Sequence, residues 1–427
     1  MNTAAKYRRT IDKRNEEIYF GLFALGALAG LLQLASPVQF GLGFEMVALG
    51  RNLAEKGSYA NPFWVLNTGF TAANPPLYPI FLAVLIKVFR IPSLIVLAVT
   101  ISNVVANAFI AALLPRVSGL FYGNVKPGIV ASLFWLVSAQ LMPSWDASFT
   151  AAGLLLFCLI SASRLGIVTN SVSTLFVGLF LSLLFLSNPS SLLISIPWIL
   201  YLTLNRKVPW GQTLALIATL LATISIWGGR NHVQLGAFVV RTNLGMTLYA
   251  SNNDCAESSM IADESHNCFQ SHHPNVSLSE ALLLNMVGEV EYDRRRTADA
   301  GTWIKTHPDK FRALTMDRIR EFWFPRLQER PFKASAIWVV TILSIPGLIV
   351  MICRRERITL FVIPVLLLYP LMYYVVVSDV RYRYPVLWLS LLPAGYFICC
   401  VCCNETSEGI FLRPKLRMAK WKQKSSE

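Results

Sequence analysis

The sequence predicts an all-helical membrane protein with about ten membrane-spanning helices. Of its 427 residues, 54% are hydrophobic and only 15% are charged. The apolar residues gather into runs of roughly 15 to 24 residues, and a helix needs about 20 residues to cross a bilayer. The Lys and Arg residues stand mostly between these runs and at the two ends of the chain. So many long apolar runs exclude a water-soluble globular domain.

The net charge of +14 would also fit a nucleic-acid-binding protein. Here, however, the basic residues form short clusters beside apolar runs, where they set topology and contact anionic lipid head groups. We therefore expect membrane lipid as a partner and no nucleic acid. The basic N-terminal segment leads into an apolar run without a small-residue cleavage site, which favours a retained first span over a cleaved signal peptide.

Candidate spans follow one another along the chain, and one of the apolar runs is doubtful because it has only about 13 residues. Several of the other runs are shorter than a perpendicular span requires, so we expect their ends to shift by a few residues. The candidate spans are 18–36, 91–114, 128–143, 147–163, 168–187, 191–204, 212–228, 334–353, 358–377 and 385–403, and the doubtful run is 77–89.

The basic residues decide whether the run 77–89 crosses the membrane. Short cytoplasmic loops carry an excess of Lys and Arg. If 77–89 does not cross, every basic short loop falls on the same side as the basic N-terminus. If it crosses, all the later basic loops move outside. We therefore expect 77–89 to lie on the outer face as a juxtamembrane or re-entrant helix, with both termini in the cytoplasm.

This topology divides the chain into three parts. Residues 1–228 form a transmembrane core whose first outer loop is 37–90, residues 229–333 form a small extracytoplasmic subdomain, and residues 334–427 hold the last spans and a basic cytoplasmic tail. The cytoplasmic loops are too short to hold a site. Any chemistry is therefore expected at the outer face of the plasma (inner) membrane.

The outer subdomain is expected to change character along its length. Its start, 239–255, reads as rich in strands and turns. Its later part has apolar residues at helical spacing, with Ser277 or Ser279 as the cap of a first helix and Pro308 as the break before the last one.

Several motifs in this layout resemble the GT-C membrane glycosyltransferases. They are the stretches ALGRNLAEKGSYANPF and TAANPPLYPIFLA, an acidic residue in each of the first two outer loops, and an Arg-rich late outer loop. Within that family the chain looks like the branch of the protein O-mannosyltransferases and aminoarabinose lipid A transferases, and most like bacterial members of it. The resemblance implies transfer of a sugar from a polyprenyl-phosphate donor to a hydroxyl of a glycan, lipid or protein, with inversion.

Two acidic residues are the catalytic candidates. Glu45 matches the first-loop acid of the family, which acts as a base or orients the acceptor, and it lies three residues after Leu42, where the more usual Asp would align. A carboxylate in a membrane-facing pocket can take a proton from an attacking hydroxyl. Asp146 matches the second acid, which faces the first across the donor site. The structural alternative is that both are first-turn acids, of helices at 45–56 and 147–163.

Arginine residues of the late outer loop are the candidates for binding the donor phosphate. The sequence SDVRYRYP places Arg381 and Arg383 outside, against the charge rule. Guanidinium groups bind phosphodiester oxygens with fork geometry and stabilise a leaving phosphate. Interfacial anchoring is the alternative role. Three further arginine residues near the outer face are lesser candidates for phosphate binding: Arg51, Arg230 and Arg241.

The outer subdomain supplies candidates for acceptor binding, each of which also has a structural explanation. The polar residues considered there are Asn243, His272 and His273, together with Asn252, Asn253 and Glu289.

Cysteine usage supports the same topology. Cys255 and Cys268 lie in the outer subdomain, and in an oxidising exterior they favour a disulfide that closes a short loop. A zinc site that adds His266 and His272 fits by residue type, but its spacing matches no strong metal motif. The sequence therefore identifies no metal-site residues and no certain cofactor. It does not decide whether the reaction requires a divalent metal.

Two other functions are compatible with this sequence. A transporter or flippase of lipid-linked sugar would use the same outer vestibule, but it needs ionisable groups or broken helices near the bilayer centre. The apolar runs show no charged residue at mid-span. A non-catalytic membrane assembly subunit would keep Glu45 and the arginine loop for structural reasons alone. The chain has no GxGxxG or P-loop pattern, which favours a lipid carrier over a nucleotide donor.

Overall fold

A computed structural model shows an all-helical protein. In the part of the chain that it describes there is no β-strand, and extended backbone pairs only at two isolated bridges, Ala60 with Phe70 and Ser259 with Ser378. The described residues are 2–34, 44–138, 146–165, 171–206, 208–328 and 331–402.

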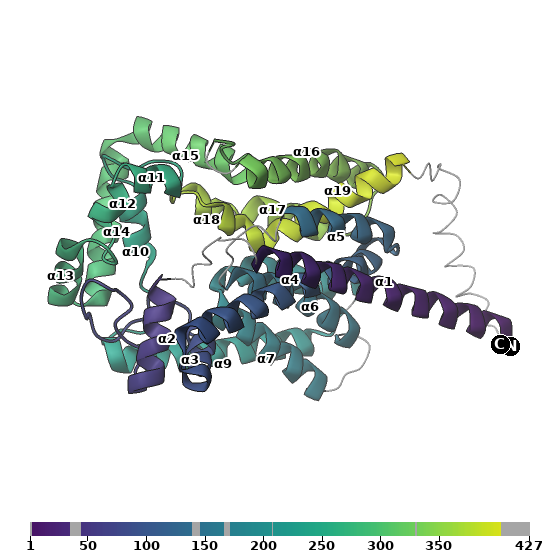
Figure 1. The fold of residues 1–427 in the computed structure, drawn as a ribbon, viewed down its shortest axis with the longest axis horizontal. Coiled ribbons are helices and arrows are strands. Elements are labelled where there is room, and N and C mark those ends of the chain that lie inside the picture. Colours follow the sequence, from purple (N-terminus) through teal and green to yellow (C-terminus); the bar gives the residue numbers. More distant parts are fainter. Residues whose placement is uncertain are drawn as a thin grey trace.

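The core is a bundle of long helices that follow the long axis of the molecule (Figure 1). Within the described residues, five helical segments are long and apolar enough to cross a membrane: Pro92–Tyr122 (α4), Ala147–Arg164 (α6), Trp210–Leu235 (α9), Ala334–Cys353 within α16 (Pro331–Cys353), and Val380–Val401, which joins η2 (Val380–Val386) to α19 (Leu387–Cys402). The other apolar runs are also helical: α1 (Asn2–Leu34), α5 (Lys126–Ser138), α7 (Ser171–Ser187), α8 (Leu192–Arg206), and α17 (Thr359–Leu368) followed by α18 (Leu371–Tyr374).

Helix α4 shows why the ends of the runs shift. The apolar run ends at residue 114, yet the helix continues through Pro115 and Arg116 to Tyr122. The guanidinium of Arg116 lies over the ring of Tyr19 on α1, 4.6 Å from its centroid, so a charged residue is accommodated in a continuing helix. The helix ends at Gly123, whose φ of 69° is the left-handed conformation that glycine adopts readily.

Helix α19 is fixed in the centre of the bundle by close backbone contacts. A Cβ added at Gly347 of α16 would come within 2.1 Å of the carbonyl oxygen of Pro393, and one at Gly395 within 2.1 Å of that of Pro127 in α5. Only glycine permits such approaches. The side chains of Trp388, Leu391 and their neighbours are buried against these helices. The segment η2 that precedes α19 therefore starts from a rigid base.

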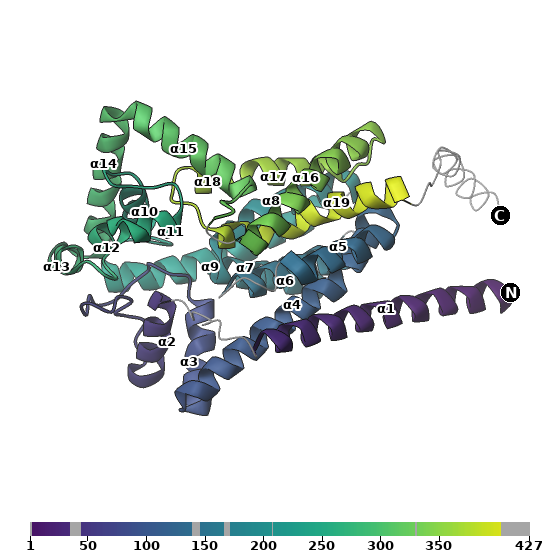
Figure 2. The ribbon, with the colours of Figure 1, turned by 45° about the horizontal axis from the view of Figure 1, so that its top comes forward.

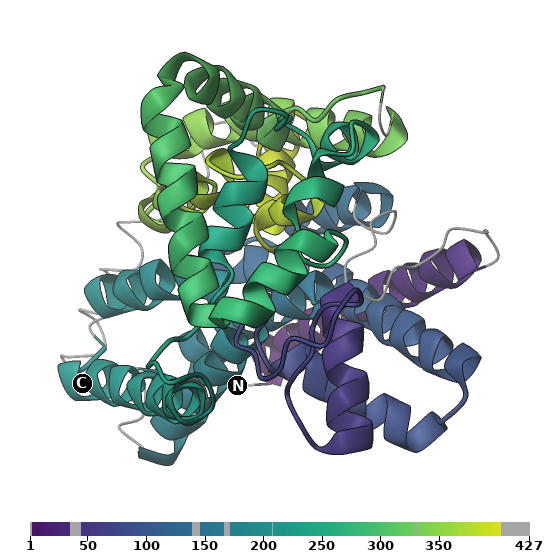
Figure 3. The ribbon, with the colours of Figure 1, turned by 90° about the vertical axis from the view of Figure 1, so that its left-hand side faces the viewer.

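The run 77–89 forms the short helix α3 (Leu77–Phe89), which packs against α2 (Phe44–Lys56) through the buried side chain of Leu82. Both helices lie across the bundle axis at one end of the molecule (Figures 1 and 3). With 13 residues, α3 is too short for a perpendicular span, and it does not follow the direction of the spanning helices.

The subdomain 229–333 gathers at the same end of the bundle as α2 and α3. Figure 2 shows the start of α1 and the end of α19 at the opposite end. The helices that follow α9 in this subdomain are α10 (Leu244–Ser251), α11 (Met260–Ser265), α12 (Cys268–His272), α13 (Leu278–Val287), α14 (Glu289–Thr306) and α15 (Pro308–Trp323).

The structure corrects one expectation in this subdomain and supports two. The segment 239–255 contains helix α10 and no strand, because α10 packs against α14 so closely that only glycine fits at Gly245. Ser277 caps α13 by accepting a hydrogen bond from the Glu280 N–H, 3.4 Å. Helix α15 begins at Pro308, directly after the end of α14, as the sequence predicts.

Candidate functional site

Two acidic residues and one arginine from three distant segments lie together at the end of the bundle that carries the subdomain. Glu45 is in the first turn of α2, Asp146 directly precedes α6, and Arg381 is in η2. The guanidinium of Arg381 interacts electrostatically with the carboxylates of both Glu45 and Asp146. Arg381 Nε also lies 3.9 Å from Asp379 Oδ2, so its charge acts on the two predicted acids and on the acid of its own segment.

Asp146 does not act as a cap of α6, since its side chain makes no hydrogen bond with the first turn of the helix. Its Oδ2 instead accepts a hydrogen bond from Asn188 Nδ2, 3.2 Å, at the end of α7. Burial raises the pKa of Asp146, and the positive charges of Arg381 and Arg241 partly oppose that shift. The carboxyl group therefore faces guanidinium and amide groups and not the helix end.

Glu45 faces the subdomain through His273. The two side chains are 21% and 10% exposed, and Glu45 Oε1 lies 3.9 Å from His273 Nε2, which is an electrostatic contact and too long for a hydrogen bond. The imidazole is stacked on Phe269 at 4.5 Å, and its Nδ1 accepts from the Asn275 N–H, 3.2 Å. Burial lowers the pKa of His273, so the neutral ring carries its proton on the Nε2 that faces Glu45.

Arg241 is the second cation of this site. Its Nε donates to the carbonyl oxygen of Ala73 at 2.9 Å, and its charge acts on Asp146. Burial by the surrounding protein lowers the pKa of Arg241, and Asp146 opposes that shift. We call Glu45, Asp146, Arg241 and Arg381 the outer charged site, after the side of the membrane on which the sequence predicts them.

A small, open hollow adjoins the outer charged site at Arg241. Its walls come from the segment that precedes α3, from the end of α7, from α9 and from the start of the subdomain. The residues that line it with Arg241 are Pro75, Pro76, Phe185, Leu186, Pro189, Trp227 and Val240. The side chain of Arg241 is exposed, as expected of one that lines an open hollow.

Two tyrosine side chains lie beside Arg381. The rings of Tyr373 and Tyr382 stack at 4.6 Å, and the guanidinium of Arg381 lies 5.2 Å from the centroid of Tyr382. Both hydroxyl groups also interact electrostatically with Arg241. The site therefore combines carboxylates, guanidinium groups and phenol groups, which together can bind a phosphate and the hydroxyls of a sugar.

Arg383 lies elsewhere, although the sequence grouped it with Arg381. Its side chain is buried in the bundle, where the guanidinium donates to the Trp323 carbonyl (3.1 Å), Thr341 Oγ1 (2.6 Å) and Ser390 Oγ (3.2 Å). A 3₁₀-helix has three residues per turn, so residues two apart do not share a face. The structure thus places Arg383 in the packing of the bundle and not in the outer charged site.

Arg230 ties the segment between α2 and α3 to α9. It donates to the carbonyl oxygens of Thr71 (2.7 Å) and Tyr59 (2.9 Å), and its guanidinium lies 5.3 Å from the ring centroids of both Tyr59 and Trp227. These bonds fix the loop that also holds Ala73, the partner of Arg241.

The remaining candidates are more peripheral. Arg51 is exposed on α2, and Asn243 precedes α10 without capping it. His272 lies beside Cys268, with its Nδ1 3.0 Å from the Cys268 carbonyl oxygen. Of the acceptor-binding candidates, His273 is the one whose contacts in the described part of the chain reach Glu45.

Cys255 and Cys268, the pair expected to be oxidised, are joined by a disulfide with an S–S distance of 2.08 Å. Together with His272 they form a cluster of metal-ligand types whose ligand atoms lie within 4.8 Å of one another. Cysteine binds a metal ion through its thiolate sulfur, and a cysteine in a disulfide has no thiolate. The cluster then retains one ligand, His272, and does not fit a zinc ion.

Some residues of the site were not identified from the sequence. Asn188 was part of a small outer loop, and the motif Asn-Pro at the end of a span is the signal that could have marked it. Tyr373 lies within an apolar run, where a tyrosine gives no sign of its partner. The segment that holds Leu42 lies outside the described residues, as does the basic tail from residue 403.

Comparisons with known proteins give little support beyond this geometry. No protein-family model matches the chain, and no curated protein matches it. A solved structure that is similar is the Archaeoglobus fulgidus oligosaccharyltransferase in complex with Zn and sulfate, with a TM-score of 0.47 and 10% identity. The match covers 93% of this chain and 51% of that protein, so this chain spans about half of its length. A likeness of this degree does not establish a shared activity.

Proposed function

We propose that the protein transfers a sugar from a polyprenyl-phosphate carrier to a hydroxyl acceptor at the outer charged site. The observation that carries the proposal is the position of Arg381, which interacts with Glu45 and Asp146 from two separate segments. Guanidinium groups suit a phosphodiester, and carboxylates suit the hydroxyls of a sugar and its acceptor. The resemblance of the first outer loop to GT-C glycosyltransferases supports the same reaction.

Arg381 and Arg241 bind the phosphate in this proposal. Both guanidinium groups act on Asp146, so a phosphate beside this carboxyl group is within reach of two positive charges. As the bond to the sugar breaks, negative charge grows on the phosphate, and fixed cations stabilise it. Arg230 and Arg383 act through packing, because backbone and hydroxyl groups already occupy them.

Glu45 is the proposed base. The acceptor oxygen attacks the anomeric carbon, its proton passes to the Glu45 carboxylate, and the bond between that carbon and the phosphate oxygen breaks with its electron pair on the phosphate. One such displacement inverts the configuration. Asp146 and Asn188 orient hydroxyl groups of the sugar. A divalent cation, where one binds, would take the carboxylate oxygens of Glu45 and Asp146.

The acceptor is proposed to arrive from the side of the subdomain. Glu45 meets that side through His273, whereas Asp146 lies deeper, between α7 and η2. Both termini are proposed to be cytoplasmic. The start of α1 and the end of α19 share one end of the bundle, away from the outer charged site (Figure 2), and the basic N-terminal segment favours the cytoplasm.

A genetic experiment tests the proposed function. Cells that lack the protein should lose one defined sugar from their glycans or glycolipids, and the wild-type chain should restore it. The variants Arg381→Ala and Glu45→Gln should not restore the sugar, even when each variant protein is present in the membrane in the same amount as the wild type. Restoration by both variants would exclude the proposed chemistry. If the protein is instead a flippase of lipid-linked sugar, Glu45→Gln should restore the sugar, because the variant removes only a proton acceptor that transport of this lipid does not need.

A further inference from the structure

The segment that carries Arg381 is hydrogen-bonded to one part of the subdomain. The first contacts come from Ser251 and Asn252, at the end of α10. Ser251 Oγ accepts from the Val377 N–H at 2.9 Å, and Asn252 Nδ2 donates to the Val375 carbonyl oxygen at 2.9 Å. Both Ser251 and Asn252 are fully buried. Water therefore does not compete for these bonds.

A second set of bonds follows a few residues later on both segments. The Ser378 N–H donates to the Ser258 carbonyl oxygen at 2.7 Å, and the Met260 N–H donates to the Ser378 carbonyl oxygen at 2.9 Å. This pair forms the isolated parallel bridge between Ser259 and Ser378. Residues 251–260, which we call the clamp segment, thus hold residues 375–378 at two places.

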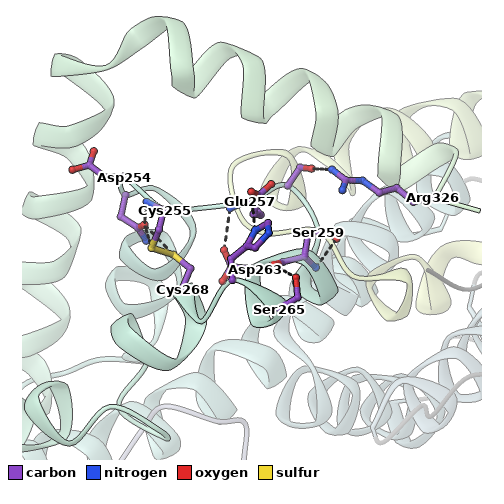
Figure 4. Close-up of polar contacts among 12 residues, drawn as sticks. Asp254, Cys255, Glu257, Ser259, Asp263, Ser265, Cys268 and Arg326 are labelled. Atoms are coloured by element: carbon purple, nitrogen blue, oxygen red, sulfur yellow. Dashed lines mark hydrogen bonds and ion pairs between the residues drawn. A yellow bond between two sulfur atoms is a disulfide. The ribbon is translucent and has the colours of Figure 1, made fainter. Parts of the chain in front are cut away.

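One end of the disulfide, Cys255, lies in the excursion between these two places, and the other end is the first residue of α12. Cys255 is joined to Cys268, and Figure 4 shows this bond. The Glu257 N–H donates to Asp263 Oδ1 at 3.0 Å, which holds the same excursion a second time. A cross-link across 13 residues restricts the open conformations of this loop.

Buried Arg318 of α15 supports the clamp segment from behind. Its Nη1 donates to Asn252 Oδ1 at 3.1 Å, and its Nη2 donates to the Ser251 carbonyl oxygen. The amide of Asn252 is therefore held at both ends, by Arg318 and by Val375. This fixes its orientation.

The bonds continue from residue 378 to Arg381. Asp379 Oδ1 accepts from the Arg381 N–H at 2.8 Å, and the Asp379 carbonyl oxygen accepts from the Tyr382 N–H at 3.0 Å. Ser378, held by the clamp segment, directly precedes this turn. A displacement of Ser378 would therefore move the backbone of Arg381.

We propose that the clamp segment, tied to α12 by the Cys255–Cys268 disulfide, positions Arg381 in the outer charged site, and that Ser251 and Asn252 are positioning residues. The proposal rests on the proposed function only for its effect on donor binding. The mechanical part is independent, since it concerns how firmly residues 375–382 are held. The catalytic geometry of the segment that carries Arg381 then depends on an oxidised bond in the subdomain.

Hydrogen exchange of the full-length protein in lipid nanodiscs tests the mechanical part. Ser251→Ala removes the acceptor of the Val377 N–H, and the double variant Cys255→Ser with Cys268→Ser opens the loop. We expect the amides of Arg381 and Tyr382 to exchange roughly five to ten times faster with Ser251→Ala, and at least about tenfold faster in the double variant. If the double variant does not fold, the purified wild-type protein is reduced with a dithiol and measured in the same way.

Ser258→Ala is the matched control. Its hydroxyl donates to Glu321 Oε1 at 2.7 Å and accepts from Arg326 at 2.6 Å, so the variant loses buried bonds close by (Figure 4 shows Arg326). The bridge to Ser378 uses backbone atoms and remains. Unchanged exchange at Arg381 and Tyr382 in both test variants would overturn the proposal. So would equal acceleration in Ser258→Ala, which would indicate general loosening.

Binding of polyprenyl phosphate in the same nanodiscs tests the functional part. Ser251→Ala should bind it several-fold more weakly than the wild type, and Ser258→Ala should bind as the wild type does. Wild-type affinity in Ser251→Ala despite faster exchange at Arg381 would contradict the positioning role. If the wild-type protein itself does not bind polyprenyl phosphate, the proposed function fails, and the exchange experiment still decides on the clamp segment.

Discussion

The two arginine residues of η2 lie in different environments, although only one residue separates them. Arg381 is 27% exposed and interacts with two carboxylates of the outer charged site, whereas Arg383 is 2% exposed and donates to Trp323, Thr341 and Ser390. The first can exchange its partners for a ligand. The second cannot leave its partners without exposing buried acceptors. The difference shows that the role of an arginine at a membrane surface follows from its partners.

The largest expected difference separates the variants Arg381→Ala and Arg383→Ala. Arg381→Ala should lower sugar transfer by at least about a hundredfold and leave the thermal midpoint of the purified protein nearly unchanged, because it removes a ligand-binding cation. Arg383→Ala should destabilise the protein by about 3 kcal/mol, because it leaves buried acceptors unsatisfied. Thermal unfolding and transfer assays on both variants measure this. Equal stability of the two variants would break the comparison.

Asp146→Asn is expected to have the next largest effect. Sugar transfer should fall by about a hundredfold. The amide oxygen of the variant can still accept the hydrogen bond from Asn188, so the local packing is retained. The raised pKa of Asp146 also predicts the sign of a stability effect. An acid that binds its proton more tightly in the folded state stabilises the fold at low pH and loses that contribution as the pH rises through its folded pKa.

Unfolding measured between about pH 4 and neutral pH therefore tests Asp146 independently of transfer. Wild-type stability should fall more steeply with rising pH than that of Asp146→Asn. Identical slopes would show that the carboxyl group has no raised pKa in the folded protein.

His273→Phe sharpens the comparison on the side of the subdomain. The ring keeps its packing against Phe269, but the Nε2 that faces Glu45 is lost. We expect transfer to fall by about tenfold, with little change in stability. His272→Phe is the control, since His272 contacts the disulfide and not Glu45. If His272→Phe lowered sugar transfer more than His273→Phe does, the acceptor would have to bind closer to His272 and α12.

Arg51→Ala should have the smallest effect. Its side chain is exposed on α2, and surface substitutions of this kind change stability by less than about 0.5 kcal/mol. Sugar transfer should remain within twofold of the wild type in the same assay, roughly the range of such a surface change. A strong loss of transfer would add Arg51 to the cations of the outer charged site.

The helical fold follows from the apolar runs, because each run must satisfy its backbone hydrogen bonds internally in lipid. Helix ends did not follow in the same way. Helix α4 continues past Arg116, whose guanidinium lies over the ring of Tyr19. Tyr19 is distant in sequence, so the apolar run itself carries no sign of this contact. Segment 239–255 became helical at α10 because α14 packs against Gly245, which local composition does not reveal.

The outer charged site could be predicted in part. Glu45, Asp146 and Arg381 are charged residues in segments between apolar runs, on the side that the charge rule predicts to be outside and poor in basic residues, and this singled them out. The sequence could not separate Arg381 from Arg383, because that depends on the 3₁₀ turn of η2 and on Thr341 of another helix. It could not rank Arg241 above Arg230 either, because that ranking depends on the carbonyl, carboxyl and aromatic groups that the fold places beside each of them.

The most direct test of the central claim is the affinity of the purified protein for polyprenyl phosphate in nanodiscs. Arg381→Ala is compared with Arg51→Ala, which removes the same charge from an exposed helix at the same end of the molecule. The account predicts at least about tenfold weaker binding for Arg381→Ala and wild-type binding for Arg51→Ala. Wild-type affinity of Arg381→Ala would contradict it.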